Sequence, residues 1–236
     1  MTIDPRLPRR FADLTTAHVA DACLRAGVPV RCAPPALRPV VAGGRLAGRV
    51  LPARHVGSVD IFLEAIDRAE PGDVLVVDND GRGDEACVGD LVVLEAQAAG
   101  LAGLVVWGLH RDTIDIRAVG LPVFSLGATP TGPQRLDPRP AAALTSARVG
   151  PWTLDGADVV LADEDGVLFV PAGRVGELCD LAESIRDTER RQADRIRAGE
   201  SLRAQVGFGA YLTGRARNPA LTFREHLRAV GGAIEE

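Results

Sequence analysis

DVLVVDNDGRGDEACVGDLVVLEAQAAGLAGLVVWG, residues 73–108, is the stretch that decides the fold class of this chain. Residues 73–78 and 104–108 are short apolar runs rich in valine, which is typical of strands buried on both faces of a sheet. Between them, a glycine-rich loop at 79–90 leads into a helix over 90–100. Because a strand, a crossover helix and a second strand in this order form a parallel pair, we predict an α/β fold.

The flanking sequence predicts further elements of both kinds. Helical periodicity predicts helices over 14–27 and 59–72. Strands are predicted at three further places: residues 44–54, 121–127 and, as a hairpin, 158–171. Proline is frequent at 28–44 and 128–140, so we expect an extended connector in the first segment and a surface excursion in the second.

The C-terminal part has a different pattern. Residues 172–198 are charged and helical with a narrow apolar stripe, and a short helix is predicted around 222–230. We therefore predict two regions, a catalytic α/β domain over 1–170 and a C-terminal helical extension over 171–236. A long charged helix beside a compact body suggests subunit packing, so we expect the extension to contact a neighbouring subunit.

The composition favours a soluble, folded, cytoplasmic protein. Apolar residues make up 46% of the 236 residues, yet no run approaches the roughly 20 apolar residues of a membrane helix, and the N-terminus lacks a secretory signal pattern. The formal charge of −5 with mixed signs argues against a nucleic-acid partner. The scattered cysteines lack the spacing of a disulfide framework or zinc site: Cys23, Cys32, Cys87 and Cys179.

The chain contains no lysine, because all 27 of its basic residues are arginine. This excludes a Schiff base with a carbonyl substrate, a lysine-bound pyridoxal phosphate and a P-loop lysine. A carbanion or enolate formed here has to be stabilised by a metal, by arginine or by backbone donors.

The run WGLHRD, residues 107–112, places three polar side chains directly after a predicted buried strand. The Asp112 carboxylate is a hard oxygen ligand suited to Mg²⁺ or Mn²⁺, and the Arg111 guanidinium can bind a carboxylate or an enolate oxygen. A surface ion pair at a turn is the alternative for this dipeptide. His110 is either a catalytic residue or a packing residue beside the site. The other histidines, His18, His55 and His226, show no ligand spacing.

The loop that ends at Gly89–Val92 is a second candidate binding element. Glycine lets the backbone approach a ligand, and a helix that starts near Asp90 presents unpaired N–H groups to an anion. A substrate carboxylate fits such a site. Asp90 as a plain helix cap is the alternative.

Together these motifs resemble the RraA-like family. The matching segments run through the chain in order: HVADAC (18–23), PGDVLVVD (71–78), GD (89–90), GLAGLVVWGLHRD (100–112), LPVF (121–124) and DVVLADEDGVLFVP (158–171). The family includes metal-dependent (class II) aldolases of 4-hydroxy-4-methyl-2-oxoglutarate and 4-carboxy-4-hydroxy-2-oxoadipate. It also includes protein regulators that bind ribonuclease E.

The resemblance implies a swivelling β/β/α three-layer domain that assembles as a homotrimer or homohexamer, with sites between subunits. It also implies residue roles: Asp112 binds Mg²⁺ or Mn²⁺, and Arg111 contacts the substrate and its enolate. Asp90, which lies 21 positions before Arg111, assists through a water molecule. The backbone beside Gly89, at Leu91 and Val92, holds the pyruvyl carboxylate.

An acid from the C-terminal part of a neighbouring subunit completes the site in the aldolases that the chain resembles. Glu189 is the first candidate for this acid, with Asp187 and Glu183 as others.

The resulting prediction is a lyase that performs retro-aldol cleavage of a 4-hydroxy-2-oxo acid or decarboxylates oxaloacetate, with a pyruvate enolate in both reactions. A regulator that binds a ribonuclease without catalysis is the first alternative. A different enolate reaction, in which His110 sets specificity, is the second. Methyl transfer, a label given to some relatives, finds no glycine-rich nucleotide motif in this chain.

Overall fold

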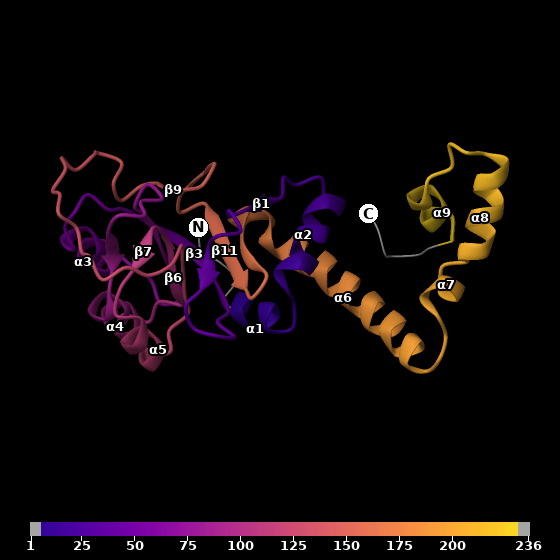
Figure 1. Ribbon diagram of the computed structural model, residues 1–236, viewed down its shortest axis with the longest axis horizontal. Coiled ribbons are helices and arrows are strands. Elements are labelled where there is room, and N and C mark those ends of the chain that lie inside the picture. Colours follow the sequence, from indigo (N-terminus) through magenta and orange to yellow (C-terminus); the bar gives the residue numbers. More distant parts are fainter. Residues whose placement is uncertain (1–5, 231–236) are drawn as a thin grey trace. The chain divides into compact units, whose positions relative to one another are not determined.

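The computed structural model describes residues 6–230 of the protein (Figure 1). Its α-helices are α1 (Leu7–Ala12), α2 (Thr16–Arg25), α3 (Asp60–Asp67), α4 (Asp90–Ala98), α5 (Thr113–Val119), α6 (Val175–Arg197), α7 (Leu202–Gln205), α8 (Phe208–Arg217) and α9 (Phe223–Val230). Its strands are β1 (Arg31–Cys32), β2 (Arg38–Pro39), β3 (Leu46–Arg54), β4 (Val74–Asp78), β5 (Ala86–Val88), β6 (Gly103–Trp107), β7 (Leu109–His110), β8 (Val123–Ser125), β9 (Ala147–Val149), β10 (Trp152–Leu154), β11 (Asp158–Asp163) and β12 (Gly166–Pro171).

The chain forms two compact units. The first comprises Met1–Ala17 and Val30–Gly176, and the second comprises His18–Pro29 and Glu177–Glu236. The sequence predicted a division between residues 170 and 171. Residues 18–29 lie before that division, yet most of α2 belongs to the second unit together with α6.

The first unit is built on a sheet with the strand order β1-β12-β11-β3-β4-β6-β8-β2. Strands β3, β4, β6 and β8 are parallel neighbours, and the pairing of β4 with β6 runs from Val74↔Gly103 to Asp78↔Trp107. The parallel pair predicted from residues 73–108 is therefore confirmed, together with the α/β fold class. Valine-rich strands pair in this way where both faces of the sheet are covered.

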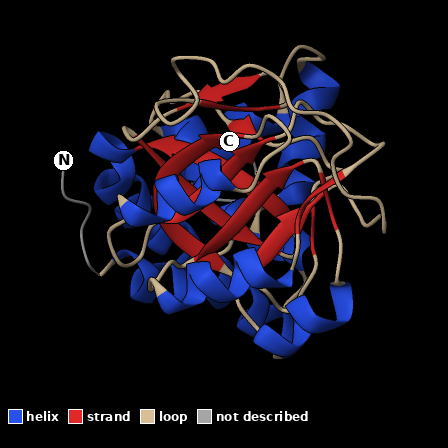
Figure 2. Ribbon diagram, turned by 90° about the vertical axis from the view of Figure 1, so that its left-hand side faces the viewer, coloured by secondary structure: helices blue, strands red, loops and turns tan. Residues whose placement is uncertain are grey.

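Strand β3 joins two halves of this sheet. Its first residues, from Leu46 to Arg49, pair antiparallel with β11, and its remaining residues, from Val50 to Arg54, pair parallel with β4. The β11–β12 hairpin is thereby folded over one face of the parallel strands, and Val160 and Phe169 pack in one buried cluster with Val76. Figure 2 shows this curl as strands that cross one another in the middle of the view.

Helices α3, α4 and α5 cover the opposite face of the parallel strands (Figure 1). Side chains alternate along β4, so that Leu75 and Val77 join the helix-side cluster while Val74 and Val76 join the other. The helix-side cluster also contains Phe62 of α3. Three layers result, with helices, parallel strands and the β11–β12 half of the sheet. This confirms the predicted β/β/α arrangement.

Several short elements were not predicted from the sequence. Strand β5 lies inside the predicted glycine-rich loop and pairs with β7 through Ala86↔Leu109 and Val88↔His110. Helix α5 follows β7, and β9 pairs with β10. Runs of two or three residues carry too little periodicity to be recognised, because a single turn or bridge gives no repeat.

The second unit is helical. The predicted charged helix is confirmed as α6, and the predicted short helix near 222–230 as α9, while α8 between them was not predicted. Aromatic rings hold α8 and α9 together, with Tyr211 5.0 Å from Phe223 between ring centroids. No helix within residues 6–230 is long and apolar enough to cross a membrane.

Candidate functional site

The candidate site lies where two neighbouring parallel strands end. Strand β4 ends at Asp78 opposite Trp107 of β6, and β6 continues after Gly108 into β7. Any side chain at position 108 would collide with Asn79, which is 2.8 Å from the position of its first carbon. Glycine is therefore required at 108, and it lets the two strand ends approach closely.

Arg111 and Asp112 follow β7 as the sequence predicted. The Arg111 backbone N–H donates to Val88 O at 2.9 Å, which attaches the pair to the end of β5. Asp112 adopts a left-handed conformation with φ of 59° before the first turn of α5. The Arg111 Nε atom lies 3.4 Å from Asp112 Oδ2, and the two side chains are 50% and 36% exposed. Both groups are therefore accessible to a ligand.

Gly89 brings the loop of the sequence prediction against this pair. A methyl group at Gly89 would lie 2.5 Å from Asp112 Oδ2 and 3.4 Å from Arg111 Nε. Gly89 also caps α4 in an extended conformation, without a side-chain cap. The backbone N–H groups of Asp90, Leu91 and Val92 belong to the first turn of α4, where a helix has no intrahelical acceptor for them.

The other predicted residues of this loop lie on α4. Asp90 is its first residue and is partly buried, Leu91 is 74% exposed, and Val92 is buried in the helix-side cluster. The proximity of Gly89 to both Arg111 and Asp112 therefore places the start of α4 beside the pair. Sequence spacing alone did not define this contact, which depends on the pairing of β5 with β7.

A surface hollow of about 330 Å³ adjoins the pair. Six residues line it: Arg111, Asp112, Thr113, Ala128, Thr129 and Pro130. Only the first two of these carry charge, so the hollow combines one cation and one carboxylate with neutral walls. The 128–140 segment, predicted as a surface excursion, supplies half of these walls.

His110 is buried beneath the pair. Its Nδ1 atom lies 2.7 Å from Ser125 Oγ, and its Nε2 atom lies 2.9 Å from Thr113 Oγ1. Burial lowers the pKa of His110, which favours the neutral ring. The two hydroxyl contacts link β7 to β8 and to α5, so the geometry favours the packing alternative over direct contact with a substrate.

The C-terminal candidates lie on α6 in the second unit. Glu189 Oε2 is 3.1 Å from His18 Nε2, and Asp187 Oδ1 is 2.7 Å from Arg186. Glu183 also has a polar partner within the described chain. Their placement in a neighbouring subunit's site stays a prediction.

The donor set around Asp112 fits Mg²⁺ or Mn²⁺ with a sparse protein ligand set. Within residues 6–230, no three His, Cys, Asp or Glu side chains gather closely enough to hold a metal by themselves. Magnesium often binds through one or two carboxylates and completes its octahedron with water and substrate oxygens. Asp112, whose side chain is 36% exposed and lies against Gly89, offers one such carboxylate, and the half-exposed Arg111 guanidinium beside it can bind an anion.

A polar network next to the site was not recognised in the sequence. Glu85 is buried and accepts hydrogen bonds from Arg135, whose Nη2 donates to Glu85 Oε1 at 2.9 Å and to Asn79 Oδ1 at 3.0 Å. His55 Nδ1 lies 2.9 Å from the same Asn79 oxygen. These four residues come from three separate segments, because Asn79 and Glu85 share the loop between β4 and β5, so no single local spacing indicated the network. The only signal for this network in the sequence was the presence of charged residues within apolar or glycine-rich segments.

The sequence that forms this site matches a known protein family. A family model described as RraA-like, Aldolase/RraA, matches residues 16–169, which is more than half of the chain. The chain belongs to the RraA-like family. The resemblance predicted from the sequence motifs is therefore confirmed.

Two relatives of this RraA-like chain show how far the likeness extends. Protein DlpA from Legionella pneumophila is 28% identical over 207 residues, covering 84% of this chain and 33% of DlpA. A protein from Halalkalibacterium halodurans named "Putative 4-hydroxy-4-methyl-2-oxoglutarate aldolase" is 33% identical over 127 residues, covering 52% of this chain and 60% of that protein. This chain thus spans between a third and three fifths of the length of these relatives.

Solved structures confirm the RraA-like fold over most of the chain. An uncharacterized protein from Pseudomonas syringae superimposes with a TM-score of 0.74 at 25% identity, covering 86% of this chain and 97% of that one. RraAS2 from Streptomyces coelicolor, described as an unusual member of the RNase ES inhibitor RraA protein family, gives 0.69 at 26% identity, covering 82% and 100%. The relatives therefore include both a named aldolase and a member of a ribonuclease-inhibitor family.

Proposed function

We propose that this RraA-like protein is a lyase that requires Mg²⁺ or Mn²⁺ and releases pyruvate from a small 2-oxo acid. The substrate is a 4-hydroxy-2-oxo acid, cleaved by a retro-aldol reaction, or oxaloacetate, which loses carbon dioxide. The observation that carries the proposal is the Arg111–Asp112 pair, accessible at a hollow and held against the glycine that caps α4. The absence of lysine supports the metal-dependent route, because a Schiff base needs a lysine amine.

Asp112 is the residue that would hold the ion. Its left-handed backbone turns the carboxylate toward Gly89 and away from the core, where burial would disfavour a charge. An ion held by Asp112 would supply Lewis-acid polarisation of the 2-oxo group of the substrate. Gly89 has no side chain, so Asp112 Oδ2 can lie against it, where a methyl group would be only 2.5 Å away.

Arg111 and the start of α4 would bind the pyruvyl half of the substrate. The guanidinium is a fixed positive group with several donors, suited to the oxygen on which negative charge develops as the carbon–carbon bond breaks. The free N–H groups of Leu91 and Val92 suit the substrate carboxylate, since a helix N-terminus favours anions. Arg111 is half-exposed, so a substrate reaches it without displacing a buried ion pair.

Asp90 would handle the proton of the reaction through a water molecule. In retro-aldol cleavage the 4-hydroxyl loses its proton, the bond between C3 and C4 breaks, and the enolate is then protonated at C3. Asp90 is partly buried at the start of α4, one residue from Gly89. His110 would act on these steps through Thr113 and the backbone of Arg111, because both of its ring nitrogens already face hydroxyl groups.

A substrate screen tests the proposal. Purified full-length protein is incubated with oxaloacetate and with a panel of 4-hydroxy-2-oxo acids, and pyruvate is detected with a coupled dehydrogenase. We expect pyruvate release that is lost on treatment with a chelator and restored by Mg²⁺ or Mn²⁺. Release that is unaffected by the chelator, or no release from any acid in the panel, would contradict the proposal.

Arg111→Lys tests the guanidinium separately from its charge. We expect kcat/KM to fall by about 10²-fold or more, because one ammonium group cannot replace the planar set of donors. Arg148→Lys is the matched control, since Arg148 is also 50% exposed but does not line the hollow beside Asp112. Equal losses in the two variants would contradict a specific role for Arg111.

We also propose assembly as a homotrimer or homohexamer. Leu91 of α4 and Ile114 of α5 are 74% and 81% exposed beside the candidate site, which suits an interface with another subunit. Light scattering coupled to size-exclusion chromatography measures the mass directly. A monomer at micromolar concentration would contradict this part of the proposal.

A protein-binding regulator is the second candidate function. It is favoured by the likeness to Streptomyces coelicolor RraAS2, all of which this chain covers. A binding assay with purified ribonuclease E or its homologue distinguishes the candidates. Tight binding that persists in Asp112→Ala, without pyruvate release by the wild type, would favour the regulator.

A further inference from the structure

A buried ion pair connects two segments that adjoin the candidate site, the β5 segment (residues 85–89) and the 128–135 loop. Glu85 directly precedes β5, and Arg135 lies in the loop after β8. The Glu85 carboxylate is 4% exposed and the Arg135 side chain 20%. Arg135 Nε lies 3.2 Å and 3.3 Å from the two carboxylate oxygens, and Nη2 lies 2.9 Å from Oε1.

The β5 segment runs from Glu85 to the start of α4. Residues Ala86 to Val88 form β5, which pairs with β7 immediately before Arg111. Val88 O then accepts the Arg111 backbone N–H, and Gly89 lies against the Arg111 and Asp112 side chains. The position of Glu85 therefore sets the start of the segment that carries Gly89.

The 128–135 loop contains Ala128, Thr129 and Pro130, which line the hollow. Its backbone is joined to the β5 segment at Ala86, whose N–H donates to Thr131 O at 2.7 Å. Beyond that point, Gly132 approaches Arg111 so closely that a methyl group there would be 3.1 Å from Arg111 Nη1. Arg135 is three residues further along, and its side chain returns to Glu85.

The ion pair is itself held by neighbours that do not reach the hollow. Asn79 Oδ1 accepts from Arg135 Nη2 and lies 2.9 Å from His55 Nδ1. His55 stacks on Phe62 with 5.3 Å between ring centroids. The network thus continues into the helix-side core, and a charge pair inside rigid surroundings fixes the two backbone segments relative to each other.

We propose that Glu85 and Arg135 are positioning residues that hold the β5 segment and the 128–135 loop together beside Arg111 and so fix the guanidinium for the substrate. They touch no substrate themselves. The catalytic part of this inference rests on the proposed lyase function, whereas the mechanical part, the fixing of the loop, does not.

The test compares Arg135→Gln with Arg49→Gln in the full-length protein. Arg49 makes a similar two-point contact with a buried carboxylate, donating to Asp73 at 2.9 Å and 2.7 Å, but at the amino end of β4 rather than at the end that carries the site. Both variants lose one arginine from a partly buried pair, so their thermal stabilities are expected to fall together. Only Arg135→Gln removes the connection between the β5 segment and the 128–135 loop.

Two measurements separate positioning from stability. For Arg135→Gln we expect kcat/KM for the best substrate to fall by about 10²-fold, mainly through KM, because a displaced Arg111 binds the pyruvyl group poorly. We expect faster hydrogen exchange in peptides that cover residues 126–134 and 86–90. Arg49→Gln is expected to change neither. Arg135→Lys is expected to recover part of both losses, since it keeps the charge without the planar fork.

Each outcome has a defined meaning. Arg135→Gln with the kcat/KM and exchange rates of Arg49→Gln would overturn the inference. If the wild type releases no pyruvate from any acid, the lyase proposal fails, and the exchange rates alone decide whether the ion pair fixes the loop. If Arg135→Gln does not fold, Glu85→Gln replaces it, because glutamine keeps the shape of the side chain and a hydrogen-bond acceptor. We then expect the same fall in kcat/KM and the same faster exchange, and values equal to those of Arg49→Gln would overturn the inference.

Discussion

The chain beyond β4 and the chain beyond β6 share one backbone feature but differ in the side chains around it. An aspartate in a left-handed conformation lies beyond each of these parallel neighbours. Asp80, with φ of 58°, is two residues after β4, and Asp112, with φ of 59°, is five residues after β6 and follows β7. In residues 6–230 they are the only residues other than glycine with positive φ. A short polar side chain tolerates this conformation better than most, so the shared backbone gives each strand end an outward carboxylate.

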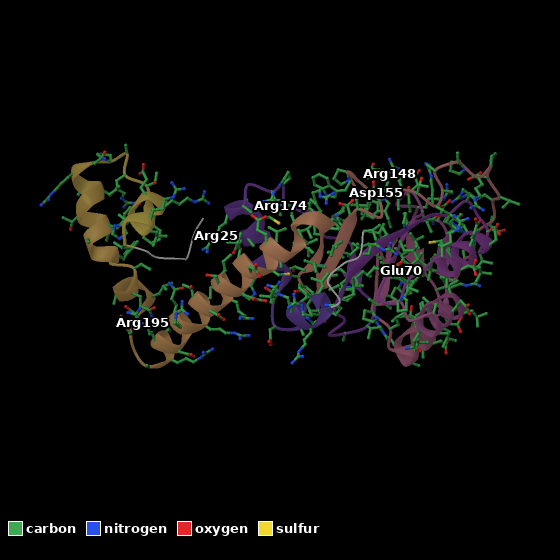
Figure 3. The ribbon with its side chains drawn as sticks, turned by 180° about the vertical axis from the view of Figure 1, so that it is seen from behind. Arg25, Glu70, Arg148, Asp155, Arg174 and Arg195 are labelled. Carbon is green, nitrogen blue, oxygen red and sulfur yellow. The ribbon has the colours of Figure 1, made fainter. Side chains whose placement is uncertain are left out.

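The surroundings give the two carboxylates different properties. Asp80 is in direct contact with the guanidinium of Arg148, which comes from β9 and is labelled in Figure 3. The hollows that Asp80 borders also contain other arginines: Arg54, Arg82 and Arg135. Asp112 has Arg111 at 3.4 Å, and its hollow is otherwise neutral. A cation would meet like charges at Asp80, whereas Asp112 remains available to it.

Removing each carboxylate gives the largest expected contrast. Asp112→Ala is expected to lower pyruvate release by on the order of 10³-fold, since it removes the proposed protein ligand of the ion. Asp80→Ala is expected to leave release nearly unchanged. Steady-state assays at saturating Mg²⁺ and titration calorimetry with Mn²⁺ measure both effects. Mn²⁺ affinity that survives in Asp112→Ala but not in Asp80→Ala would reverse the assignment.

Filling the space beside Asp112 is expected to have a smaller effect. In Gly89→Ala, the new methyl group would lie 2.5 Å from Asp112 Oδ2, so the carboxylate or the start of α4 has to shift. We expect kcat/KM to fall by about 10- to 100-fold, with weaker Mn²⁺ binding. Gly83→Ala is the control, because nothing lies within 4 Å of its added carbon. A Gly89→Ala variant with wild-type kinetics would show that this contact does not position the carboxylate.

The buried network of His55, Asn79, Glu85 and Arg135 near the end of β4 predicts a modest pH dependence of stability. Burial, more than any other cause, lowers the pKa of His55 from its ordinary value of 6.5, although Asn79, Glu85 and Asp60 act to raise it and Arg135 also lowers it. Between the folded pKa and 6.5 the unfolded chain binds more protons, so the free energy of unfolding rises with pH in that window and falls on acidification.

His55→Gln isolates this contribution. We expect urea denaturation between pH 5 and 7.5 to show a smaller loss of stability on acidification in the variant than in the wild type. The difference in slope is at most about 1.4 kcal/mol per pH unit, the limit for one proton. Identical slopes in the two proteins would show that His55 does not titrate differently in the folded and unfolded states.

Periodicity predicted the long elements of the fold and missed the short ones. The β-branched runs of β4 and β6 and the charged repeat of α6 extend over enough residues to show their period. Strand β5 has three residues and β7 has two, and each exists because it pairs with the other. Pairing between segments more than 20 residues apart is a tertiary event, and no local pattern encodes it.

The residues of the site divide in the same way, into those predicted from the sequence and those found only in the structure. Arg111, Asp112 and Gly89 were predicted as its members from residue chemistry and family resemblance, and the structure brings these three together. His110 was weighed between catalysis and packing, and the hydroxyl groups of Ser125 and Thr113 favour packing. Glu85 and Arg135 were not recognised, because the two residues are 50 positions apart in the sequence and no local pattern predicts their contact of 2.9 Å.

The sequence by itself determined the fold class, the parallel strand pair and a chemistry that excludes lysine, since these follow from composition and short-range pattern. Only the tertiary structure decided which of the two left-handed aspartates has a single arginine in its hollow and which lies among several. It also decided that a proline-rich loop serves as a wall of the site. The physical reason is that the availability of a charge depends on every group packed around it, and those groups come from segments distant in the chain.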